Sequence, residues 1–121
     1  MDNIKKARAE NTFLREITAI IRERVSDPDV GFVTILRVKI SKDGKFAKIY
    51  YNALGDDKSR RKTQKALTRC AKFIQFEIGK KIRARNIPHL SFFLDRNLDY
   101  AMRMEEIFNK NIKEDSEDSD N

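Results

Sequence analysis

The lysines and arginines of residues 58–85 are the side chains with the clearest chemical potential. This segment holds eleven Lys and Arg and a single acid, Glu77. Its apolar residues repeat at helical spacing, and several cations and one aromatic ring project from the opposite side of that helix. They are Arg61, Lys65, Arg69, Lys72, Phe76 and Lys80, and Arg83 and Arg85 follow near the end of the segment. Because cations bind phosphates and an aromatic ring stacks on an unpaired base, this pattern is typical of a surface that binds single-stranded RNA.

The role of Phe76 has a second interpretation. A bend in the helix, or a helix nearer the C-terminus, would cover the ring and make it a packing residue. The sequence leaves both interpretations open.

Two other groups of residues extend the basic surface. Arg8, Arg15 and Arg22 repeat every seven residues and therefore lie along one side of an N-terminal helix. Lys39, Lys48 and Tyr50 alternate with apolar residues and share the wetter faces of two strands. Each group is either a further contact with RNA or an ordinary solvated surface.

The charge balance points to a polyanionic partner. The chain of 121 residues carries 26 Lys and Arg against 19 Asp and Glu, a formal net charge of +7. Five of the acids and none of the bases lie in residues 114–121, so residues 1–113 hold 26 bases against 14 acids, a net +12. Such a concentration of positive charge favours RNA or DNA, with an anionic membrane or an acidic protein as the alternatives.

Catalysis finds little support in the sequence. His89 follows Pro88 at the entrance of a strand and is expected to be a turn or surface residue, and Cys70 falls on an apolar helix stripe. The four glycines are too dispersed for a phosphate-binding loop. A magnesium-dependent nuclease would need several carboxylates, and the candidates Asp27, Asp29, Asp95 and Asp99 also suit turns and helix caps. We therefore predict no catalytic residue, no metal and no cofactor, with the nuclease as the weaker alternative.

The elements that must position these residues follow from hydrophobic periodicity. The pattern predicts helix 4–25, strands 32–41 and 46–54, helix 58–85, strand 90–95 and helix 98–113. The first two strands should form a hairpin, and the third, reached through a helix, can lie parallel to the second. This order indicates an α+β fold in one domain, residues 1–113, followed by a disordered acidic tail, residues 114–121. The longest uncharged run has nine residues, too few to span a membrane, and a cytoplasmic protein is expected.

Several of these segments, in their order and spacing, carry a family resemblance. They are Asp27-Pro28, Val38-Lys39-Ile40-Ser41-Lys42-Asp43, Ala47-Lys48-Ile49-Tyr50, Phe73-Ile74, and Arg85-Asn86-Ile87-Pro88-His89-Leu90-Ser91-Phe92-Phe93-Leu94-Asp95. From Lys5 to about Phe108 the chain resembles ribosome-binding factor A, a family of bacterial small-subunit assembly factors. The resemblance implies a type II KH-like fold of the order helix-strand-strand-helix(-helix)-strand, here with an added C-terminal helix, and without the GxxG loop of ordinary KH domains.

The resemblance also implies a function and partners. It implies a non-enzymatic factor that binds the free or immature 30S subunit and 16S rRNA and supports 16S rRNA 5′-end processing. Assembly GTPases are candidate partners, and a monomer is expected. A generic KH-like RNA-binding protein is the alternative.

Three positions depart from the family pattern. The family has a kinked helix with an Ala-x-Gly element, which aligns with Cys70-Ala71-Lys72, so that Lys72 replaces the glycine. A straighter helix is therefore expected here. Asp29 and Gln75 stand where the family often has arginine, so cationic contacts at these two positions are missing.

Overall fold

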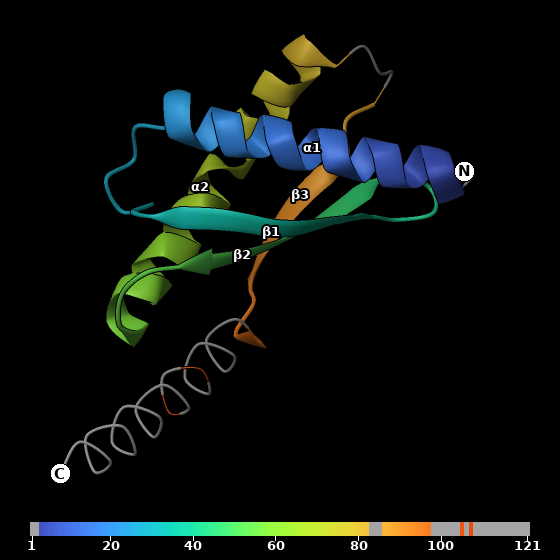
Figure 1. Ribbon diagram of the computed structural model, residues 1–121. Helices are drawn as coiled ribbons and strands as arrows, with labels where there is room; N and C mark the ends of the chain where they lie inside the picture. The colour runs from blue at the N-terminus through green and yellow to red at the C-terminus, as the bar shows by residue number, and fades with distance from the viewer. Residues whose placement is uncertain (1–2, 83–85, 98–104, 106, 108–121) are drawn as a thin grey trace, which may run out of the picture.

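The structure, a computed structural model, describes residues 3–82, 86–97, 105 and 107. Two helices and one three-stranded sheet make up the fold, in the order α1 (Asn3–Glu23), β1 (Val33–Ile40), β2 (Phe46–Ala53), α2 (Asp57–Lys81) and β3 (His89–Leu94). In Figure 1, α1 lies above β1 and runs along it, whereas α2 crosses at a steep angle. The predicted order of the first five elements and the α+β class are confirmed.

The sheet has the strand order β1-β2-β3. β1 and β2 form the predicted antiparallel hairpin, and β3 pairs with β2 in parallel, as the helical connection between them allows. The turn at residues 41–45 is closed by Asp43, whose Oδ1 accepts hydrogen bonds from the Ser41 hydroxyl and from the Lys45 N–H. The pairings of β1 with β2 and of β2 with β3 determine which strand side chains share a face of the sheet.

The core lies between the sheet and both helices. One set of alternating strand residues is buried, among them Val38, Ile49, Tyr51 and Phe92, and it belongs to the same cluster as Ile17 and Ile20 of α1. From α2 the cluster takes Leu67, Ala71, Ile74 and Ile78, which recur at the helical spacing expected of this segment, and Cys70 and Ile82 of the same stripe pack against it. Both helices therefore cover the same face of the sheet.

Polar contacts fix the start of α2 against the sheet. Asp56 caps the helix by accepting a hydrogen bond from the Ser59 N–H at 2.8 Å. The Tyr51 hydroxyl bonds Gln64 Oε1, and Gln64 Nε2 donates to the Phe92 carbonyl at 2.9 Å. One side chain of α2 thus bridges two strands, which sets the rotation of the helix about its axis.

Two details of the predicted elements are wrong. α2 ends at Lys81 and not near Arg85, because Ile82 takes an extended conformation (φ −110°, ψ 122°) and the returning chain places Ile87 against Gly79 in the last turn. Asn52 is buried at 9% exposure, although it alternates with apolar residues on the same side of the strand as Lys48 and Tyr50, the side expected to be wetter. Its Oδ1 accepts a hydrogen bond from the Ala53 N–H at 2.7 Å, so the buried amide oxygen is paired.

The predicted helix 98–113 lies outside the described residues, apart from residues 105 and 107, and the tail 114–121 lies wholly outside them. Within the described part of the chain, no helix combines the length and the apolar character that crossing a bilayer requires.

Candidate nucleic-acid interface

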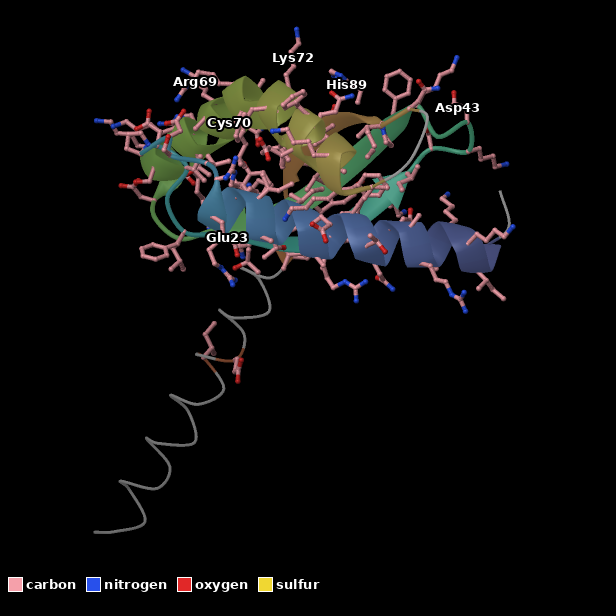
Figure 2. All side chains as sticks on the ribbon, turned by 90° about the horizontal axis from the view of Figure 1, so that it is seen from above. Glu23, Asp43, Arg69, Cys70, Lys72 and His89 are labelled. Carbon is pink, nitrogen blue, oxygen red and sulfur yellow. The ribbon has the colours of Figure 1, made fainter. Side chains whose placement is uncertain are left out.

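One side of α2 presents cations to solvent. Arg61, Lys65, Arg69, Lys72, Phe76 and Lys80 are all exposed and follow one another at intervals of three or four residues, so they line one side of the helix. We call these six residues the α2 basic face. In Figure 2 the labelled side chains of Arg69 and Lys72 project outward from the helix.

Phe76 lies in the open on this face. Its exposed fraction is 63%, and α2 runs without a break through Cys70, Ala71 and Lys72. The described residues therefore support the exposed interpretation of Phe76 over the buried one. Lys80 places its Nζ 4.7 Å from the centre of the ring, a cation–π contact.

A shallow depression surrounds the Phe76 ring. It is lined by Lys72, Gln75, Phe76, Gly79, Lys80 and Ile87. Gln75 closes one side by donating from Nε2 to the Ile87 carbonyl at 3.0 Å. A base resting on the ring would meet an apolar floor with two lysines beside it.

Glu77 is a residue of the site that the periodicity did not single out. Its side chain is buried at 6% exposure, and it pairs with Lys80 Nζ at 3.3 Å and with Arg24 Nε at 3.7 Å. The pairing holds Lys80 close to Phe76 and joins α2 to the end of α1. The signal in the sequence was its position as the single acid among eleven bases.

Arg69 differs from its neighbours, because its guanidinium is already paired. Nη2 lies 3.0 Å from Asp27 Oδ2 and 3.4 Å from Asp29 Oδ2. Asp27 also accepts a hydrogen bond from the Asp29 N–H, and this bond and Arg69 hold the pKa of the Asp27 carboxyl below its usual value. Arg69 thus ties the loop after α1 to α2, and its cation is shared with two carboxylates.

The remaining predicted cations lie elsewhere. Arg8, Arg15 and Arg22 are exposed on α1. Arg83 and Arg85 lie outside the described residues. Lys58 and Lys62, which we did not predict, are exposed near the start of α2 and extend its positive charge.

The catalytic candidates occupy structural positions. His89 is exposed at the start of β3, edge-on to Phe46 at 6.3 Å between ring centres. Cys70 is half-buried, and burial together with the charge of Asp27 raises the pKa of its thiol. Asp95 Oδ1 accepts a hydrogen bond from the Asn97 N–H, which is the turn role that was one of the two interpretations of this carboxylate. Asp99 lies outside the described residues. Among the described residues, no group of three or more His, Cys, Asp or Glu is arranged to hold a metal ion.

Comparison with known proteins gives the family. The sequence profile of ribosome-binding factor A matches residues 5–108. The chain belongs to the ribosome-binding factor A family. It is similar to ribosome-binding factor A of Staphylococcus epidermidis, with 37% identity over 115 residues that cover 95% of this chain and 99% of the relative.

Solved structures of the family share the fold. The crystal structure of ribosome-binding factor A from Thermus thermophilus matches with a TM-score of 0.65 and 26% identity, covering 74% of this chain and 94% of that one. A homology model of the Thermus thermophilus protein, fitted into a cryo-EM map of its complex with the 30S subunit, matches with a TM-score of 0.55 and 25% identity over 75% of this chain and 91% of that one. The fold implied by the resemblance is therefore confirmed for the described elements.

Proposed function

We propose that this chain is a non-enzymatic assembly factor that binds the free or immature 30S subunit through 16S rRNA and supports maturation of the rRNA 5′ end. The observation that carries the proposal is the α2 basic face in a member of the ribosome-binding factor A family. Assembly GTPases as further partners, and a monomeric state, belong to the same proposal.

The arrangement of α2 suits contact with folded rRNA. Its apolar side is fully occupied by the core, so the opposite side is free to meet another molecule over several helical turns. Lys65 and Lys72 offer cations without a described acidic partner within salt-bridge distance, and Phe76 adds a ring face between Lys72 and Lys80. Phosphate contacts of this kind supply most of the affinity, and stacking adds preference for unpaired bases.

Support for the ribosomal partner comes from the family. The homology model of the Thermus thermophilus protein was fitted into a cryo-EM map of its complex with the 30S subunit. A generic RNA-binding protein would share the charge and the ring but would bind unrelated RNA equally well, so the discriminating test must use ribosomal particles.

The test is sedimentation of the full chain with purified ribosomal particles in sucrose gradients. We expect it to migrate with free 30S subunits and to remain at the top of gradients that contain only mature ribosomes. Lys65→Gln combined with Lys72→Gln should release it from 30S subunits. Binding to both kinds of particle, or to neither, would contradict the proposal.

A matched control removes the same charge elsewhere. Lys42 and Lys45 are exposed in the β1–β2 turn, and Figure 2 shows Asp43 of that turn at the far end of the molecule from Arg69. Lys42→Gln combined with Lys45→Gln should leave sedimentation with 30S subunits nearly unchanged. If both double variants lose binding equally, net charge rather than the α2 basic face is responsible.

Salt dependence gives a second measure of the same contacts. If each lysine of the α2 pair neutralises one phosphate, the slope of log K against log salt should flatten by roughly 1.4 to 1.8 in the Lys65→Gln, Lys72→Gln protein. An unchanged slope would place the phosphate contacts on another surface.

A further inference from the structure

The face of the sheet that points away from both helices carries aromatic rings and cations in register. Pairing across the strands places Arg37 opposite Tyr50, and Tyr50 opposite Phe93. The neighbouring row, two residues along, places Lys39 opposite Lys48. We call Arg37, Lys39, Lys48, Tyr50 and Phe93 the outer sheet face.

The rings and cations of this face contact one another. The Arg37 guanidinium carbon lies 4.3 Å from the centre of the Tyr50 ring, and the Tyr50 and Phe93 ring centres are 5.9 Å apart with planes tilted by 32°. Lys48 Nζ lies 6.0 Å from the Phe93 ring centre. One cation and two rings thus form a continuous row across three strands, and a second cation from the neighbouring row lies beside the second ring.

Burial separates this row from the core. Phe93 is 43% exposed, Tyr50 is half-buried, and the three cations are exposed, whereas the strand residues on the other face are packed under the helices. A partly exposed phenylalanine that lies beside a second ring still has apolar area that a partner could bury. The ring is available to a partner.

The charge of this face selects the partner. None of the three described strands contains Asp or Glu, and their basic residues all lie on the outer sheet face. An acidic protein segment would satisfy the cations but has no need of two neighbouring aromatic rings. Unpaired nucleotides contact both the cations and the rings, because their bases stack on aromatic rings while their phosphates bind lysine and arginine.

We propose that the outer sheet face is a second RNA-binding surface, which takes a single-stranded segment by stacking bases on Tyr50 and Phe93 and holding its phosphates with Arg37, Lys39 and Lys48. This surface goes beyond the α2 basic face and lies on the other side of the core. It acts on unpaired nucleotides, and duplex RNA, whose bases are stacked on one another, binds it less well.

A single tryptophan can report on this surface, because the chain has none. Tyr50→Trp keeps a large ring on the outer sheet face, and its emission should be quenched saturably by a single-stranded RNA oligonucleotide. An RNA duplex of the same length, at the same salt concentration, should quench this emission at least tenfold less effectively. Absence of quenching by the single strand would overturn the proposal.

A variant at the second ring tests stacking while it keeps an apolar side chain. In the Tyr50→Trp background, Phe93→Leu should weaken oligonucleotide binding by roughly 5- to 150-fold, the range expected for loss of one stacked base. Phe32→Leu changes an exposed ring that precedes β1 and belongs to neither basic surface, so it should leave quenching of Trp emission on the sheet unchanged. Equal effects of the two leucine variants would mean that the signal does not come from the outer sheet face.

Two alternative occupants are separated in the same assay. If residues 98–121 of this chain cover the face, acrylamide will fail to quench the emission of the free Tyr50→Trp protein. If an acidic protein is the natural partner, a polyglutamate peptide will quench as well as RNA at equal charge. Either result overturns the proposal, and neither affects sedimentation with 30S subunits, which tests the proposed function separately.

Discussion

Replacement of Phe76 by alanine separates a binding role from a folding role. Because 63% of Phe76 is exposed, only about a third of a side chain that buries roughly 150–250 Å² when fully covered is protected from water. At about 25 cal/mol per Å², this area is worth at most about 2 kcal/mol, and alanine keeps part of it. Truncation of a buried phenylalanine such as Phe92, which is 5% exposed, should cost about 3–5 kcal/mol.

The expected effect on RNA binding is comparable to or larger than the effect on folding. Loss of one stacked base costs about 1–3 kcal/mol of binding free energy, a roughly 5- to 150-fold increase in Kd. The assay pairs urea unfolding with titration of a single-stranded fragment of 16S rRNA. Phe76→Leu, which keeps an apolar side chain but no ring, should lose affinity as alanine does.

A matched control is Phe32→Ala. Phe32 is 81% exposed and immediately precedes β1, outside the α2 basic face, so its loss should change neither stability nor RNA affinity appreciably. The reasoning fails if Phe76→Ala loses 3 kcal/mol or more of stability while RNA affinity is unchanged. That result would mean that the ring is covered in solution.

Three further predictions concern the elements around α2. Asp27→Asn keeps the turn but removes the charge beside Arg69; because the pKa of Asp27 is lowered in the folded state, wild type should be the more stable at neutral pH, and the difference in Tm should shrink as pH falls below about 4. Gly55→Ala should lower the free energy of unfolding by about 1–3 kcal/mol, since Gly55 has φ +121° and a Cβ there would lie 2.9 Å from a side-chain carbon of α2. Measured by urea unfolding, this loss should be larger than the loss in Gly44→Ala, where φ is +73° and the space around the Cβ is open. Removing residues 114–121, which carry five acids and no apolar residue, should raise RNA affinity at low salt without changing Tm; equal affinities would exclude competition by the tail.

Periodicity predicted the described elements because each has one buried side. Ile17 and Ile20 of α1, and Leu67 and Ile74 of α2, recur at helical spacing, and all four are fully buried. The strands alternate for the same reason. What the pattern could not supply is the point at which a helix ends, since the end of α2 at Lys81 depends on where the returning chain packs.

The site was predicted less completely than the fold. A helical projection places Arg69 among free cations, but its pairing with Asp27 joins residues 42 positions apart, a contact that depends on how the loop after α1 folds back. The same limit applies to Glu77, which pairs with Arg24 immediately after α1. A helical projection gives the direction of a side chain relative to its own helix axis, and it contains no information about which residues of other segments contact that side chain.

The two basic surfaces differ in what they can contact at once. The α2 basic face is opposite the core side of its helix, and the outer sheet face is opposite the core side of the sheet, so the core separates Phe76 from Tyr50 and Phe93. A short oligonucleotide would engage one surface or the other. A large folded RNA presents phosphates and unpaired nucleotides on several sides, and once one surface is bound, the second meets its segment at a high effective concentration. If both proposed surfaces bind RNA, two modest surfaces on opposite sides of a small domain would favour a structured ribosomal particle over free single strands, without any base-specific contact.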